Sequence, residues 1–215
     1  GLDRRMRSAI TLTALVALDT PRDALDLLTL AQDRCGASLT GFELMSRICL
    51  DLVATHFPLL PRPFAQQHPQ YVLMELSSSE SARHAQDLLE QTIAAALESG
   101  TVRDAVVASS IEQSRGLWQV REHISMAQAA AGKNIKHDIS LPISRIDEFL
   151  SAADDQLRVA FPGCVLVTFG HLGDGNLHYN VAPPVGVAHD AFLANQDAIN
   201  RIVHDQVAAF GGSIS

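Results

Sequence analysis

Val165-Leu-Val-Thr-Phe-Gly-His-Leu-Gly-Asp-Gly-Asn-Leu-His-Tyr-Asn-Val181 contains the clearest structural signal in the chain. Two runs, 165–171 and 176–181, are rich in residues that favour β-strands, and an Asp-Gly pair lies between them. An Asp-Gly pair between strand-like runs strongly indicates a β-hairpin, because both residues tolerate the backbone angles of a tight turn. We therefore predict two neighbouring antiparallel strands here.

Two histidines flank the turn of this hairpin. If Asp174 and Gly175 alone form the turn, His171 faces His178 directly, with Cβ atoms about 4.5–5.5 Å apart. Asn180 follows His178 by two positions and projects from the same face. Two imidazoles so placed predict a shared metal, with bonds of about 2.0–2.1 Å for zinc. The alternatives are a histidine pair on a solvated hairpin and a longer turn that shifts the pairing.

The rest of the chain alternates between strand-like and helix-like segments. Further strands are predicted at residues 11–18, 71–76, 104–108 and 135–141. Helices are predicted at residues 21–36, 42–57, 79–99, 111–131, 142–149 and 188–210. Because several strands are joined by short links, we predict an α+β fold with a ferredoxin-like, antiparallel or mixed sheet and helices packed mainly on one face. The sequence contains neither the glycine fingerprint of a dinucleotide fold nor a P-loop.

A group of polar residues precedes the hairpin. Arg121 and Ser125 are four positions apart in a predicted helix, so their side chains share a face. Arg121 offers a planar fork that suits a carboxylate, and Ser125 adds a hydroxyl donor. Lys136 lies on the polar face of the alternating strand at 135–141. The alternatives are a surface arginine paired with a nearby glutamate and a solvated lysine.

The composition narrows the classes of function. The 215 residues carry 16 Lys and Arg against 24 Asp and Glu, a net charge of −8, without a basic stripe. Nucleic acid is a disfavoured partner, because phosphate binding needs clustered positive charge. No apolar run reaches the ~18 residues of a membrane span. Cys35, Cys49 and Cys164 form no CxxC motif, so we expect buried free thiols and a cytoplasmic protein.

Gly170-His-Leu-Gly-Asp-Gly-Asn-Leu-His178 resembles the signature of the C-terminal domain of FAD-linked oxidases. That family includes D-lactate dehydrogenases, the glycolate oxidase flavoprotein subunit and D-2-hydroxyglutarate dehydrogenase. Three more segments resemble the family, in its order: Gly41-Phe-Glu-Leu-Met45, Leu117-Trp-Gln-Val-Arg-Glu122 and Lys136-His-Asp-Ile-Ser-Leu-Pro142. The resemblance covers nearly the whole chain.

The resemblance implies oxidation of a D-2-hydroxy acid to the 2-oxo acid, with hydride passing to FAD and a divalent metal polarising the hydroxyl. It implies that His171 and His178 bind the metal, which is zinc or manganese from the chemistry of the ligands. Arg121 and Lys136 match residues that hold the substrate carboxylate, and Ser125 matches a nearby hydroxyl residue. Asn180 matches a polar residue beside the substrate hydroxyl, which gives it a substrate-binding and catalytic role. A homodimer stays open, and the sequence does not name the electron acceptor.

Two parts of the family pattern are missing from residues 1–215. The family has a Glu-His-Gly segment after the last helix and a flavin-binding domain before this region. We therefore expect a substrate- and metal-binding domain truncated at its C-terminus, which has no dehydrogenase activity alone and binds metal weakly or not at all. The alternative is a stand-alone metal- or anion-binding module without redox chemistry. A metal-dependent hydrolase would need a third, acidic ligand, for which the candidates are Glu43, Glu75, Glu112, Glu122 and Asp138.

Overall fold

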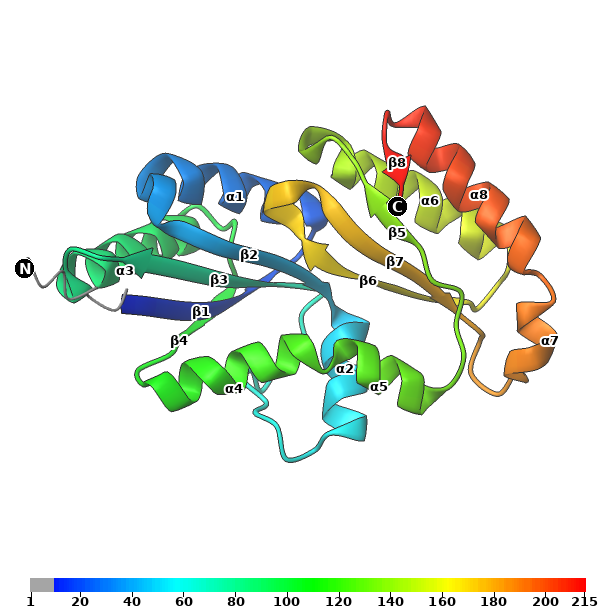
Figure 1. Ribbon diagram of the computed structural model, residues 1–215, viewed down its shortest axis with the longest axis horizontal. Helices are drawn as coiled ribbons and strands as arrows, with labels where there is room; N and C mark the ends of the chain where they lie inside the picture. Colours follow the sequence, from blue (N-terminus) through cyan, green and yellow to red (C-terminus); the bar gives the residue numbers. More distant parts are fainter. Residues whose placement is uncertain (1–9) are drawn as a thin grey trace, which may run out of the picture.

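The computed structural model describes residues 10–215 (Figure 1). Within this range the strands are β1 (Ile10–Leu18), β2 (Leu39–Ser46), β3 (Gln70–Ser78), β4 (Asp104–Val107), β5 (Asp138–Ser140), β6 (Val165–His171), β7 (Asn176–Ala182) and β8 (Ser213–Ile214). The helices of the same range are α1 (Pro21–Cys35), α2 (Arg47–His56), α3 (Ala82–Glu98), α4 (Ile111–Glu122), α5 (Ile124–Ala131), α6 (Ile146–Ala160), α7 (His189–Leu193) and α8 (Gln196–Ala209).

The strands of the described range form one antiparallel sheet in the order β4-β1-β3-β2-β6-β7-β5-β8. This arrangement confirms the predicted α+β class and the predicted hairpin, which is β6–β7. Strand β2 joins the two halves of the sheet, because it pairs with β3 along its length and with the end of β6 through Glu43, Leu44 and Met45. The centre of the sheet therefore brings an early segment of the chain beside the hairpin.

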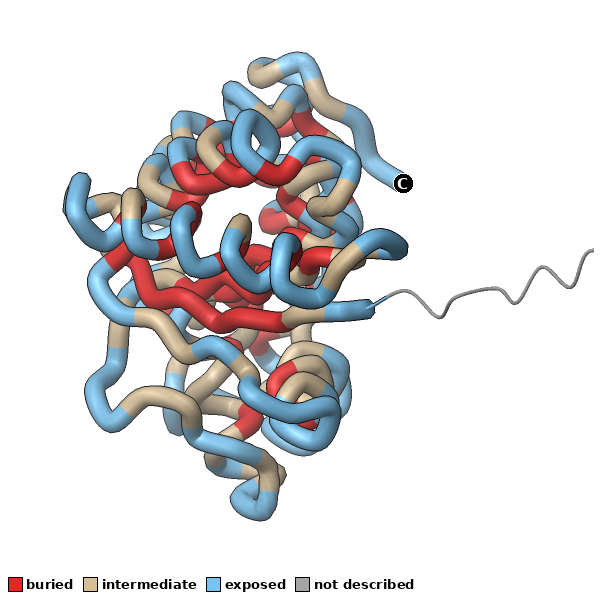
Figure 2. Tube along the Cα trace, turned by 90° about the vertical axis from the view of Figure 1, so that its left-hand side faces the viewer, coloured by how far each residue is buried: buried red, intermediate tan, exposed pale blue. Residues whose placement is uncertain are grey.

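Helices lie on both faces of the sheet (Figure 1). The long helices α1, α3, α6 and α8 pack on one face and form the larger apolar core. Helices α2, α4 and α5 cover part of the other face with a second, smaller core. Figure 2 shows the buried residues concentrated along the strands between these layers. The larger group of helices agrees with the packing mainly on one face that we expected, and the smaller group adds a layer on part of the other face.

The segment 42–57, predicted as largely helical, is instead the end of β2 followed by α2. Residues Phe42 to Met45 are all buried, because β2 is a central strand that is covered on both faces. A strand of this kind loses the alternation of apolar and polar residues and reads as a continuous apolar run. Periodicity alone cannot separate such a run from a buried helix.

Two predicted helices are each divided into two. The helix expected at 111–131 breaks at His123 into α4 and α5, and the one expected at 188–210 forms α7 and α8. The three cysteines are free and buried, as predicted. No helix within residues 10–215 combines the length and the apolar character needed to cross a membrane.

Candidate functional site

The turn between β6 and β7 is longer than the two residues that we predicted. Residues Leu172–Asp174 form a short 3₁₀ turn, and Gly175 completes it with a φ of 71°. Phe169, rather than His171, therefore faces His178 across the hairpin. A side chain at Gly175 would place its Cβ 2.3 Å from the carbonyl oxygen of Leu141, so only glycine fits there.

The direct opposition of the two histidines is thus wrong, but their common face is retained. His171 lies two positions beyond Phe169 on β6, so both side chains project from the same face of the sheet. His178 shares that face because it pairs with Phe169. The two histidines are diagonal neighbours, which in antiparallel pairs lie about 7–8 Å apart, with their Cβ atoms somewhat closer.

His171 is paired with a buried carboxylate on β2. Glu43 lies opposite His171 in the strand register, and its Oε1 is 2.9 Å from His171 Nδ1. The Glu43 side chain is 3% exposed, whereas the His171 side chain is 61% exposed. A carboxylate at Nδ1 favours the tautomer with its proton there, which leaves the lone pair on Nε2.

His178 has the same kind of partner on its other side. Asp138 on β5 lies opposite His178, and its Oδ1 is 2.6 Å from His178 Nδ1. Both side chains are exposed to solvent by 42% or more. The ring of Phe169 packs against the His178 ring, with centroids 4.7 Å apart, and so limits its orientation.

Arg121 reaches the same face from the end of α4. Its guanidinium carbon lies 4.9 Å above the ring of Phe169, and its Nε is 3.7 Å from Glu43 Oε1. The glutamate partner of the alternative interpretation is therefore present, but the Arg121 side chain is only 13% exposed and does not lie on the surface. An aromatic face and a carboxylate together restrain the guanidinium.

Asn180 and Lys136 lie on the same face as the two histidines. Asn180 belongs to β7, and Lys136 lies two residues before β5. Ile135 bridges Val181 and Asp138 pairs with His178, which places Lys136 at the register position of Asn180. Lys136 is exposed, as its place on the polar side of the alternating segment predicts. Asn180 is buried and forms hydrogen bonds with the backbone N–H of His137 and with Gln128.

Ser125 lies in the first turn of α5 and is exposed. The break at His123 interrupts the helix between it and Arg121, so their common face no longer follows from helical spacing alone. Its contact with substrate stays a prediction. In the described range no three His, Cys, Asp or Glu side chains gather in a way that could hold a metal ion.

Burial shifts the pKa values of Cys49 and of His137. It raises the pKa of the Cys49 thiol to about 11, although Ser46 and Arg121 act in the opposite direction. Cys49 is therefore a protonated core residue rather than a nucleophile. Burial also lowers the pKa of His137, which favours the neutral imidazole; this ring lies on the opposite face of the sheet, where it contacts Asn200 of α8.

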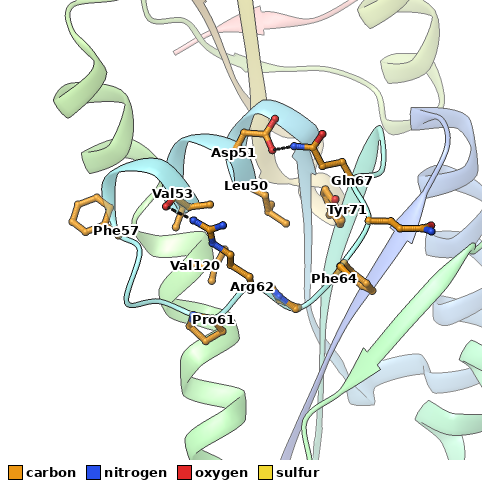
Figure 3. A pocket seen from close by; sticks show the side chains of 14 residues that line it. Leu50, Asp51, Val53, Phe57, Pro61, Arg62, Phe64, Gln67, Tyr71 and Val120 are labelled. Carbon is orange, nitrogen blue, oxygen red and sulfur yellow. Dashed lines mark hydrogen bonds between the residues drawn. The ribbon is translucent and has the colours of Figure 1, made fainter.

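A cavity of about 610 Å³ lies between α2, the loop that follows it and the end of α4 (Figure 3). It is formed by α2, the loop that follows it and Val120, the neighbour of Arg121 in sequence. The predicted site residues do not line this cavity. His171 instead borders a smaller hollow of about 240 Å³ beside Gly173 and Asp174.

Residues 8–215 match the family described as FAD linked oxidases, C-terminal domain. The chain belongs to this family. The fold of this oxidase domain is similar to that of a solved alkyldihydroxyacetonephosphate synthase, with a TM-score of 0.61, 8% sequence identity, and coverage of 97% of this chain and 40% of that one. At so low an identity the likeness shows the fold alone.

Curated relatives of this oxidase domain are D-2-hydroxyglutarate dehydrogenases. The protein from Stutzerimonas stutzeri is 34% identical over 214 residues, which are 99% of this chain and 45% of that protein. The one from Xanthomonas citri pv. viticola is 34% identical over 182 residues, 85% of this chain and 38% of that protein. The mitochondrial protein from Rattus norvegicus is 38% identical over 146 residues, 68% of this chain and 26% of that protein. The chain thus spans less than half the length of these relatives.

The sequence analysis did not predict that Glu43 and Asp138 pair with the two histidines on this face. Both were considered only as acidic ligands for a hydrolase. The signal for Glu43 was a lone charge inside the apolar run Gly41–Met45, since a buried carboxylate needs a partner. The identity of that partner depends on the pairing of β2 with β6, which no local pattern encodes.

Proposed function

We propose that this chain is the substrate-binding part of an FAD-dependent dehydrogenase that oxidises a D-2-hydroxy acid to the 2-oxo acid. The observation that carries the proposal is the gathering of two histidines, two cations and a buried amide on one face of the sheet. His171, His178, Arg121, Lys136 and Asn180 come from four separate segments of the chain. Membership of the FAD-linked oxidase family supports flavin chemistry, and the names of the relatives support a hydroxy acid.

Arg121 and Lys136 hold the substrate carboxylate in this proposal. The Nε edge of Arg121 faces Glu43 and one face of its guanidinium lies on Phe169. No hydrogen bond of its Nη groups is present in the part of the chain that the structure describes, so they can form the paired contacts that a carboxylate accepts. The exposed Lys136 adds a second positive charge near Asn180.

His171 and His178 fit a divalent metal as two nitrogen ligands. A metal-bound histidine usually donates its other ring N–H to a carboxylate, and both histidines have a carboxylate at Nδ1. Both imidazoles are also exposed enough for Nε2 to reach a ligand. When bound, zinc or manganese supplies Lewis acidity at the substrate hydroxyl. Because two protein ligands are fewer than the three usual in catalytic zinc sites, we expect weak metal binding by residues 1–215 alone.

Asn180 is proposed to bind the hydroxyl group of the substrate. One of its two amide hydrogens is engaged by Gln128, so the second can donate to an oxygen in the site. Asn180 is buried, and a hydrogen bond to substrate from a buried amide is shielded from competing water. Its contribution is to orient the carbon that loses hydride.

The flavin is proposed to come from a region outside this chain. FAD supplies the hydride acceptor when bound. Hydride transfer needs a site from which water is excluded, yet the His171 and His178 side chains are solvent-exposed. A flavin-binding region that covers this face would exclude water and present the acceptor.

The test is a steady-state screen of D-2-hydroxy acids on a full-length parent protein, with and without a chelator. D-2-Hydroxyglutarate is the first substrate to test, followed by D-lactate and glycolate. We expect turnover of at least one of them, and loss of turnover after chelation that added zinc or manganese restores. Activity that survives complete removal of metal would rule out the metal role. Failure to oxidise any hydroxy acid would rule out the proposed reaction.

Residues 1–215 are proposed to be inactive by themselves. Anaerobic mixing of residues 1–215 with free FAD and a D-2-hydroxy acid should leave the flavin absorbance unchanged. Bleaching of the flavin at a rate that depends on the hydroxy acid would contradict this expectation. A cytoplasmic location also stays a proposal, which fractionation of cells that express the parent would test.

A further inference from the structure

A chain of hydrogen bonds crosses the buried edge of the site. The backbone N–H of His137 donates to Asn180 Oδ1 over 3.3 Å. Asn180 Nδ2 donates to Gln128 Oε1 over 3.0 Å. Asn180 is 4% exposed and Gln128 is 3% exposed, so water does not compete for either bond.

These two bonds determine which way the Asn180 amide points. A backbone N–H can only donate, so the Asn180 atom that faces His137 is the oxygen. The nitrogen of Asn180 then faces Gln128, which must present its own oxygen. One lone pair of Oδ1 and one N–H of Nδ2 remain for a ligand, on the face shared with Lys136 and His178.

Gln128 reaches this position from the helix layer above the sheet. It follows Ser125 by three positions in α5, so it is one turn further from the break at His123. Its Oε1 serves Asn180, while its Nε2 is buried without a hydrogen-bond partner in the described part of the chain. An unpaired buried donor costs free energy, so stability alone does not account for a glutamine here.

We propose that Gln128 is a positioning residue for Asn180, which holds the amide in the orientation needed to bind the substrate hydroxyl. This inference rests on the proposed function, because it assigns Gln128 to the same site. Without the acceptor at Oε1, only the longer 3.3 Å bond from the His137 N–H restrains the Asn180 amide. The side chain can then rotate about its last bond and present its nitrogen and oxygen to the ligand less uniformly. The binding of the carboxylate by Arg121 and Lys136 does not depend on this bond.

The first experiment compares Gln128→Leu, Gln128→Met and Gln128→Glu in the full-length parent. Leucine and methionine remove the acceptor, and we expect each to lower kcat about tenfold, the worth of one hydrogen bond. Glutamate keeps a carboxylate oxygen opposite Asn180 and should recover most of the loss. Gln206→Leu is the matched control. Gln206 lies on α8, in the other helix layer, and the substitution removes a similar amide–amide hydrogen bond to Gln156 of α6.

The second experiment separates positioning from a loss of structure. A substrate analogue without the 2-hydroxyl, glutarate for a hydroxyglutarate substrate, should inhibit the wild type and Gln128→Leu with similar constants. In a double-mutant cycle, Gln128→Leu should add nothing once Asn180 is replaced by alanine, because it acts through Asn180. Additive losses, or a parallel loss of glutarate binding, would overturn the inference.

Crystal structures of the wild type and Gln128→Leu give a readout without activity. We expect the Asn180 amide to turn or to occupy a second orientation in the variant. An Asn180 side chain that keeps its single orientation overturns the inference even if the proposed reaction is correct. If the parent oxidises no hydroxy acid, the proposed function fails, and the same two structures still decide whether Gln128 orients Asn180.

Discussion

The two histidine–carboxylate pairs differ in environment, although each places a carboxylate oxygen within 3 Å of the histidine Nδ1. In the Glu43–His171 pair the carboxylate belongs to a central strand and is 3% exposed. In the Asp138–His178 pair the carboxylate is on a short strand near the edge of the sheet and is 60% exposed. Charge interactions are stronger where water is excluded, so we expect Glu43 to contribute more than Asp138 to the site. Glu43 also restrains Arg121, which gives it a second task that Asp138 lacks.

The largest effect is expected from the histidines themselves. His171→Ala and His178→Ala in the full-length parent should each lower kcat/KM by at least about a hundredfold, because loss of a residue that merely orients a metal ligand already costs about 10- to 100-fold. Steady-state kinetics and the metal content of each purified variant measure this. His84→Ala on α3, which lies on the other face, is the control. Near-normal activity of either variant would show that the substituted histidine has no role in the reaction.

Glu43→Gln is expected to have the next largest effect. It removes the charge that faces both His171 and Arg121, so kcat/KM should fall by about 10- to 100-fold. The free energy of unfolding should fall by about 1–3 kcal/mol, because Arg121 loses its buried counter-charge. Kinetics and urea unfolding measure the two effects, with Glu148→Gln, from an exposed ion pair, as the control. A Glu43→Gln protein as active as the control would show that the buried carboxylate has no role in the site.

The third prediction concerns the turn between β6 and β7, whose length shifts His171 out of register with His178. Gly175→Ala forces an L-residue into positive φ and brings its Cβ against the Leu141 carbonyl oxygen. Gly186→Ala has a similar φ of 82° but open space around it, so it should lose only the backbone cost of about 1–2 kcal/mol. Urea unfolding should show a larger loss for Gly175→Ala than for Gly186→Ala. Equal losses would mean that the contact with Leu141 relaxes easily.

Asp138→Asn should have a smaller effect than Glu43→Gln. An exposed ion pair contributes about 0–1 kcal/mol to stability, and salt screens it. We expect kcat/KM to fall by about tenfold or less, because the loss of a residue that orients a metal ligand costs about 10- to 100-fold and Asp138 is exposed. Measuring both carboxylate variants at low and high ionic strength tests the comparison directly. A larger loss for Asp138→Asn than for Glu43→Gln would reverse our ranking of the two pairs.

The smallest effect is a pH dependence from His137, a histidine with no carboxylate partner. Burial lowers its pKa in the folded chain below the ordinary value of 6.5. The unfolded chain therefore binds a proton more readily, and the stability present above pH 6.5 declines as the pH falls through that value. Urea unfolding between pH 7.5 and 5.5 should show a weaker decline in His137→Gln than in the wild type. Identical slopes would mean that another group causes the decline.

Some features of this domain could be predicted from local patterns. The Asp-Gly turn signal predicted the β6–β7 hairpin, and the alternation from Ile135 to Leu141 predicted which side chains face the interior. Register could not be predicted so well. A turn of four residues instead of two moved the partner of His178 from His171 to Phe169. The extra residues depend on the contact of Gly175 with Leu141, a residue 34 positions earlier in the chain.

The amino-acid sequence was sufficient for the α+β class, the antiparallel hairpin and the residue types of the site, because these depend on local propensity and on short spacings. The partners of those residues were not predictable in the same way. Glu43 meets His171 and Arg121 only because β2 pairs with β6 and α4 packs above them, and Gln128 meets Asn180 only because α5 crosses β7. Contacts between distant segments arise from packing of the whole chain, so local patterns do not contain them.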